Sequence, residues 1–118
     1  MKYMLIHVID PTAEHGTDGM PAFDSWLEEV QARGVSLHGG RLRGVDDATT
    51  VQVRDREMLI SDGPFAETKE QIAGYDVIEC ADLDEAIEIA AKHPTAWLGT
   101  IEVRPIQEVR CGSPEEAG

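Results

Sequence analysis

The 118-residue chain carries 23 acidic and 10 basic side chains, a formal net charge of −13, and 42% hydrophobic residues. This length and composition predict one globular domain with a modest core. The negative charge repels phosphate backbones and anionic membrane surfaces, so we expect no nucleic-acid binding and no membrane partner. No apolar run approaches the ~20 residues of a membrane span. The N-terminus is too polar for a signal peptide, which predicts a cytoplasmic protein.

The first part of the chain predicts two strands around one amphipathic helix. Residues 2–9 are apolar on both faces, a pattern typical of a strand in the middle of a sheet. A helix follows in which apolar residues recur from Phe23 at i, i+3, i+4 and i+7. Gly34 supplies the expected stop of this helix. The second strand is predicted over residues 35–42.

A β-hairpin and a sharp corner come next. Residues 49–54 and 57–61 are short strand-like runs joined by the two polar residues 55–56, which indicates a hairpin. The apolar run then turns at residues 62–64, Asp-Gly-Pro, where glycine tolerates positive φ and proline fixes its own. Phe65 is therefore a large apolar side chain displayed just after a rigid corner.

The connector after the corner is polar. Thr68 and Gln71 have the spacing of a helix capping box, but Gly74 limits any helix there to about one turn. Residues 75–80 form the next predicted strand, and no low-complexity linker interrupts the chain.

A second amphipathic helix is predicted to begin after Asp82, which has Glu85 three residues later as in a capping box. Its expected apolar face consists of Leu83, Ala86, Ile87 and Ala90. The His-Pro pair at residues 93–94 ends the helix, because the residue before proline leaves the α region. Residues 95–99 are expected to form a loop, and residues 100–106 the last strand.

Apart from the inserted hairpin, the predicted order is strand, helix, strand, strand, helix, strand. This is the ferredoxin-like βαββαβ pattern of an α+β fold, with two helices on one face of an antiparallel sheet. Residues 2–9 are apolar toward the other face as well, and the short chain has no third layer to cover it. We therefore predict a homodimer. The predicted domain spans residues 1–106, and residues 107–118 form a polar C-terminal tail.

Three residues are candidates for acid–base chemistry. His7, on the predicted central strand, is either a hydrogen-bonded core residue or part of a pocket wall. His38 stands beside the paired glycines 39–40, where a ligand or another backbone can come close. Asp62 either caps backbone N–H groups of its own turn or acts in a cleft with Lys69 or a histidine nearby.

The remaining histidines and cysteines have structural interpretations. His15 lies in a polar loop. His93 lies at a helix C-terminus, where the negative end of the helix dipole favours a protonatable side chain. No histidine pair has metal-site spacing, and no phosphate loop or dinucleotide fingerprint is present, so we predict neither a metal nor a cofactor. Cys80 and Cys111 form no close-spaced pair, and they lie in a predicted strand and in the polar tail, so we expect neither a zinc knuckle nor a disulfide framework.

The Asp-Gly-Pro-Phe corner and the residues that follow it, Ala-Glu-Thr-Lys-Glu-Gln at 66–71, resemble the signature of the DGPF branch of the YCII-related proteins. The resemblance extends from Met1 to about Ile106. It implies a dimeric α+β barrel in which two sheets face each other. Some members of the wider family look like small lyases or dehalogenating enzymes, and relatives in this branch look associated with extracytoplasmic-function sigma factors.

The site proposed for the wider family is a histidine near the start of the first helix, paired with an aspartate before the proline that follows the second helix. In this chain the first position falls at or near Phe23 and the second at His93, so neither residue matches. The family's dyad is therefore absent, and we do not expect its dehydrochlorinase-like activity here.

Three functions remain open from the sequence. The leading one is a dimer that binds a small ligand in a cleft near the corner, through Asp62, Gly63, Pro64, Phe65 and Lys69. The second is a lyase or isomerase with His38 or His7 as base and Asp62 as orienter. The third is a regulatory protein whose acidic surface binds a basic partner such as a sigma factor.

Overall fold

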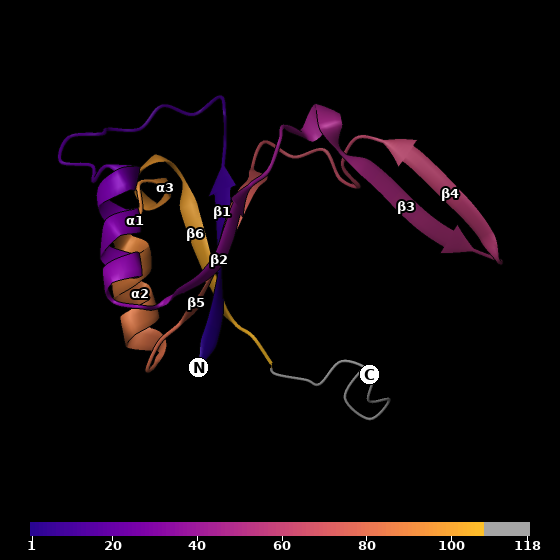
Figure 1. The fold of residues 1–118 in the computed structure, drawn as a ribbon. Coiled ribbons are helices and arrows are strands. Elements are labelled where there is room, and N and C mark those ends of the chain that lie inside the picture. The colour runs from indigo at the N-terminus through magenta and orange to yellow at the C-terminus, as the bar shows by residue number, and fades with distance from the viewer. Residues whose placement is uncertain (108–118) are drawn as a thin grey trace.

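The computed structural model describes residues 1–107 as a four-stranded antiparallel sheet with helices on one face, and a separate two-stranded ribbon (Figure 1). The strands are β1 (Lys2–Ile9), β2 (Ser36–Arg41), β3 (Thr49–Arg54), β4 (Glu57–Asp62), β5 (Gln71–Glu79) and β6 (Thr100–Pro105). The helices are α1 (Phe23–Ala32), α2 (Leu83–Ala91) and the short α3 (Thr95–Leu98), with a 3-10 turn, η1, at Val45–Asp47. Of the predicted tail, all but the first residue lies outside the described part of the chain.

The strand order is β2-β5-β1-β6, and β1 pairs antiparallel with both β5 and β6. With α1 and α2 as the two crossovers, this is the ferredoxin-like arrangement, so the predicted α+β fold is confirmed. The central position of β1 is confirmed as well. None of the helices within residues 1–107 has both the length and the apolar character needed to cross a bilayer.

The core lies between the sheet and the helices. It is built from Tyr3, Leu5, Trp26, Val30, Val35, Ile78, Cys80, Ala86, Ile89 and Ala90. The indole N–H of Trp26 donates a hydrogen bond of 2.9 Å to the carbonyl of Ile89, which fixes α1 against α2. Trp26 is thus a core residue, as its position in the apolar stripe of the helix predicts.

The buried face of α2 differs from the expected one. Leu83 and Ile87 are 48% and 51% exposed, whereas Ile89 is fully buried. The small side chains of Ala86 and Ala90 let the helix approach the sheet closely, and this approach places Ile89 in the core. Aliphatic residues occur on more than one side of α2, so the sequence pattern alone could not select the correct face.

Two segments after residue 64 correct the sequence-based interpretation. No helical turn forms at Thr68, and β5 begins at Gln71, because residues 71 and 72 pair with the end of β1. Backbone pairing with a central strand therefore outweighs the local capping-box signal. The predicted loop at residues 95–99 contains α3, a single turn that follows Pro94.

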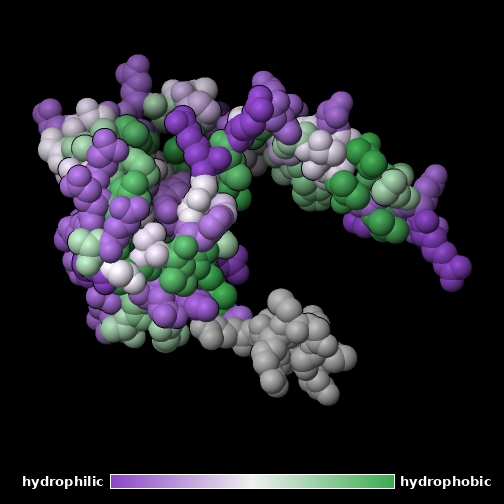
Figure 2. Space-filling model, in the orientation of Figure 1, coloured by the Kyte–Doolittle hydropathy of each residue, from purple (hydrophilic) through white to green (hydrophobic). Residues whose placement is uncertain are grey.

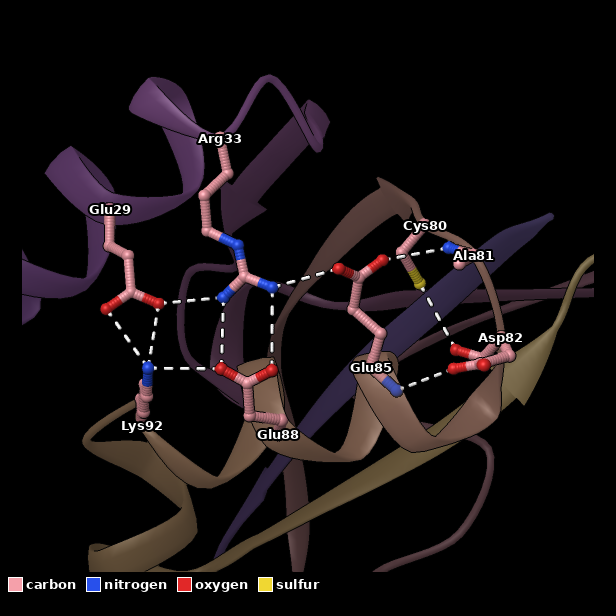
Figure 3. A network of polar contacts seen from close by, with 8 residues as sticks. All are labelled: Glu29, Arg33, Cys80, Ala81, Asp82, Glu85, Glu88 and Lys92. Carbon is pink, nitrogen blue, oxygen red and sulfur yellow. Dashed lines mark hydrogen bonds and ion pairs between the residues drawn. The ribbon is translucent and has the colours of Figure 1, made fainter.

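A network of charges joins α1 and α2 on the outside of the helical layer (Figure 3). Arg33 bonds to Glu29, Glu85 and Glu88 at 2.9, 3.0 and 3.1 Å. These carboxylates raise the pKa of Arg33 above its ordinary value. Lys92 bonds to Glu29 and Glu88 at 3.0 and 3.1 Å. Two cations thus bridge three carboxylates and reduce their mutual repulsion across the two helices.

The start of α2 has the predicted cap. The Asp82 carboxylate accepts a hydrogen bond of 2.9 Å from the backbone N–H of Glu85. The Glu85 carboxylate accepts in turn from the N–H of Ala81 at 2.8 Å, one residue earlier than in a standard capping box. Gly34 has a φ of +67°, which confirms it as the residue that ends α1.

The second face of the sheet is open. Met4, Ile6 and Val8 of β1 point away from the buried side of that strand and are only partly buried. In the part of the chain that the structure describes, α1, α2 and α3 lie on the other face (Figure 1). Of the two apolar faces of β1, the helices therefore cover one, and no described element covers the other.

The β3–β4 ribbon, which we call the arm (residues 49–62), projects from the domain (Figure 1). Its turn residues Asp55 and Arg56 have φ values of 51° and 65°, the left-handed conformations typical of a tight two-residue hairpin turn. The predicted hairpin is therefore confirmed. The radius of gyration is 16.9 Å, against about 13 Å for a compact domain of this length.

Candidate functional site

Two histidines and an aspartate meet on the helix-facing side of the sheet. His7 comes from β1, Asp76 from β5 and His93 from the turn between α2 and α3. The Nε2 atom of His7 lies 2.6 Å from Oδ2 of Asp76, and the rings of His7 and His93 have centroids 4.3 Å apart. His7 is 6% exposed and His93 is 7% exposed. Three ionisable groups are thus held together beside an apolar core.

The strand register explains why these residues meet. Asp76 lies opposite Leu5 and Gly74 lies opposite His7, so His7 and Asp76 are diagonal neighbours on one face of the β1–β5 pair. Gly39 of β2 lies opposite Asp76 on the other side, and a Cβ atom at position 39 would clash with Oδ1 of Asp76. The absence of a side chain at position 39 therefore gives the carboxylate its space.

Aromatic side chains of α1 enclose the His93 ring. Trp26 and Phe23 both meet it edge to face, with centroid distances of 4.6 and 5.7 Å. Trp26 is buried, whereas Phe23 is 48% exposed. Phe23 consequently forms the boundary between the cluster and solvent on the α1 side.

The protonation state of His93 is fixed by its neighbours. The backbone N–H of Thr95 donates to Nδ1 of His93 at 3.0 Å, so Nδ1 carries no proton and the neutral ring has its proton on Nε2. Burial, with a further contribution from His7, lowers the pKa of His93 from 6.5 to about 4, and Asp76 opposes this shift. At neutral pH His93 is therefore an uncharged ring with an Nε2–H donor.

His7 presents its two ring nitrogens differently. An ionised Asp76 can only accept hydrogen bonds, so the Nε2 atom of a neutral His7 carries the proton and Nδ1 has the lone pair. This Nδ1 atom is buried and has no hydrogen-bond partner among residues 1–107. Leaving a buried acceptor unpaired costs about 1–3 kcal/mol, so such an atom in a native core requires an explanation.

The cluster has the composition of a metal site, since one ligand atom from each of His7, Asp76 and His93 lies within 4.8 Å of the others. The hydrogen-bond pattern argues against this use. The Nδ1 lone pair of His93 already accepts from Thr95, and its Nε2 atom holds a proton, so the neutral ring offers no lone pair to an ion. Proton transfer suits this arrangement better than metal coordination.

A model of the YCII-related domain matches residues 1–110. The chain belongs to the YCII-related family. It is similar to Uncharacterized protein R00369 of Rhizobium meliloti (strain 1021), with 44% identity over 68 residues. That match covers 56% of this chain and 55% of the relative, so it spans about half the length of each.

In this YCII-related protein, Phe23 and His93, the residues at or near the positions where the resemblance places a dyad, lie together. They are in ring contact, next to the pair formed by His7 and Asp76. The histidine–aspartate pair of this chain is supplied by β1 and β5. The sequence interpretation missed Asp76 altogether and gave His93 only a role at the helix end.

His38 lies on the open face of the sheet. It pairs with Val77 in the β2–β5 register, whereas Asp76 points to the opposite side. Its Nδ1 atom is 2.6 Å from the hydroxyl of Tyr75, and the two rings stack with centroids 5.5 Å apart. Within one chain, therefore, the structure does not bring His38 together with His7.

Asp62 lies at the end of β4, opposite Thr49, and belongs to the arm and not to the four-stranded sheet. The φ of Gly63 is +92°, as the corner predicts. The turn is held by the Gly63 N–H, which donates to Ala48, and by the Thr50 hydroxyl, which donates to the Gly63 carbonyl, both at 2.8 Å. The Asp62 carboxylate makes no hydrogen bond to the described residues, so it does not cap the N–H groups of its turn, which was one of the two roles considered for it.

Two further residues predicted to bind a ligand at the corner, Phe65 and Lys69, are also open to solvent. Phe65 is 79% exposed, and Lys69 is an exposed connector residue whose charge helps to lower the pKa of Asp10 after the larger effect of hydrogen bonds from Thr12. Two depressions of about 150 and 340 Å³ border β6 and its neighbours, and residues 62–65 line neither of them. Ligand binding at the corner therefore stays a prediction.

Proposed function

We propose that this YCII-related protein is a proton-transfer enzyme of the lyase or isomerase class, with His7 as general base and Asp76 as its orienter. The observation that carries the proposal is the 2.6 Å contact between His7 and Asp76 together with the buried, unpartnered Nδ1 of the same ring. A carboxylate on one imidazole nitrogen fixes the tautomer and stabilises the imidazolium that forms when the other nitrogen accepts a proton.

The surroundings support this role. His93 stays neutral beside His7, so it does not oppose the positive charge that His7 gains. Trp26 and Phe23 keep the cluster largely dry, which strengthens the electrostatic contact with Asp76. The enclosure favours a small substrate, which enters past the half-exposed Phe23.

The experiment is a proton-exchange screen. Small carbonyl and hydroxy acids are incubated in D₂O with the protein, and loss of each C–H signal is followed by proton NMR. We expect wild type to exchange at least one compound, His7→Gln to exchange none, and Asp76→Asn to be slower by about 10²–10⁴-fold. His15→Gln, in an exposed loop, is the control. Exchange that survives His7→Gln would disprove the assignment, and so would a panel with no exchange above buffer.

The open face of the sheet supports a homodimer as the working form. Met4, Ile6 and Val8 form an apolar surface on the central strand, and burying such residues favours association. Sedimentation equilibrium at micromolar concentration should show a dimer, and Ile6→Asp should dissociate it. A wild-type protein that remains monomeric would rule the dimer out.

A further inference from the structure

One face of the arm is apolar and exposed. In its antiparallel register, Val51 lies opposite Ile60 and Val53 lies opposite Met58, so these four side chains share a face. They are 59%, 59%, 59% and 64% exposed in the order Val51, Ile60, Val53 and Met58. Contiguous apolar surface of this kind marks an interaction site.

The arm also lacks support from its own domain. A lone two-stranded ribbon is marginally stable in water, and it becomes stable when its apolar face packs against something. The arm extends away from the sheet in Figure 1 and leaves its apolar face uncovered within the described chain. A cover that stabilises it has to be present whenever the chain is folded.

The position of the arm indicates where this cover lies. The arm projects on the side of the sheet opposite the helices, which is the side of the open face (Figure 1). In Figure 2, hydrophobic side chains gather both along the arm and along the flank of the domain that faces it, around one hollow. A body seated on the open face would therefore touch the arm as well.

Charge is compatible with a second copy of the chain as this body. The tip of the arm carries Arg54 and Arg56 beside Asp55 and Glu57, so it is locally neutral in a chain whose net charge is −13. The tip therefore does not repel an acidic partner, and a second copy of the chain is such a partner. With two-fold symmetry, each arm would pack on the other copy. The apolar face of the arm and the open face of the sheet would then be buried in both copies.

We infer that the arm of each chain packs its Val51, Val53, Met58 and Ile60 face on a second copy. The inference rests on the proposed homodimer and adds the arm to its interface. Joined open faces and two arms then form one continuous contact between the copies.

The test compares two surfaces of the same strands. Val53→Asp with Met58→Asp places charge on the apolar face, and Gln52→Asp places it on the opposite face of β3. Because all three positions are away from the core, circular dichroism should show an unchanged fold. Sedimentation equilibrium should show a dimer dissociation constant raised about tenfold or more in the double variant and unchanged in Gln52→Asp. Hydrogen exchange of the arm amides in wild type should slow as dimer forms.

Each contrary result has its own meaning. A double variant that dimerises as tightly as wild type would overturn the arm contact while leaving the sheet-to-sheet dimer intact. Arm amides that exchange at the same rate in monomer and dimer would do the same. A wild-type monomer would overturn both the dimer and the arm contact, without bearing on proton transfer by His7.

Discussion

Replacing His93 with asparagine measures the electrostatics of the cluster, because asparagine does not titrate and still offers an acceptor to the Thr95 N–H. The folded protein keeps His93 neutral down to its pKa of about 4, whereas the unfolded chain binds a proton below pH 6.5. The unfolded state therefore binds more protons between these values, and the free energy of unfolding falls as the pH is lowered through this window. The difference between 6.5 and about 4 corresponds to about 3 kcal/mol, a large share of a typical total stability of about 5–15 kcal/mol.

The assay is urea unfolding followed by tryptophan fluorescence, at several pH values from about 7.5 to 4 and at one protein concentration. The variant should be less stable than wild type near neutral pH, because the packing of His93 against Trp26 is lost. It should also lose about 2–3 kcal/mol less than wild type as the pH falls.

Carboxylates whose pKa values are lowered in the folded state, such as Glu29 and Glu88, are present in both proteins and cancel in this difference. His15→Asn, in the exposed loop, should follow the wild-type curve. Parallel curves for wild type and His93→Asn would refute the conclusion that burial holds His93 neutral.

Other substitutions give separate expectations. Gly39→Ala should lower the free energy of unfolding by about 1–3 kcal/mol, because its Cβ displaces Asp76; loss of the downfield His7–Asp76 proton in NMR would accompany it, and a spectrum like wild type would contradict the clash. Gly63→Val should cost about 1–3 kcal/mol, because φ is +92° there, and an unchanged melting temperature would count against a strained turn. Asp62→Ala should change stability by less than about 0.5 kcal/mol, since the carboxylate bonds to none of the described residues; a larger loss in urea unfolding would show a missing contact. Fluorescence polarisation should detect no binding of random duplex DNA at physiological salt, given the net charge of −13; salt-sensitive micromolar binding would contradict this.

Most of the fold follows from local patterns. The two-sided apolar run of β1, the stripe of α1 with Gly34 after it, the two-residue hairpin turn and the cap at Asp82 each have a local physical cause, and each is present in the structure. The errors in the predicted fold arise where contacts between residues far apart in sequence determine the local structure. Gln71 joins β5 because β1 lies beside it, and a capping box read from neighbours along the chain cannot include that contact.

The site was harder to predict because its members are far apart in sequence. His7, Asp76 and His93 are brought together by strand register and by the turn after α2, and no motif spacing encodes this meeting. One signal was present. Asp76 alternates with Ile78 and Cys80, so it had to lie on the core side of its strand, where a charged residue needs a partner. Gly39 was noted as a place where a ligand or another backbone can come close, and in the structure its missing side chain leaves room for Asp76.

The position of β1 also determines the order in which the chain can fold. β1 precedes the other strands that the structure describes, yet its partners are β5 at residues 71–79 and β6 at residues 100–105. Its two edges therefore stay unpaired until these later residues have left the ribosome, whereas the arm can close around its own turn within microseconds. A nascent chain stopped before β6 would expose one edge of its central strand, ready to pair with another unfinished copy. Early translational arrest should thus favour aggregation, and completion of β6 should end that risk.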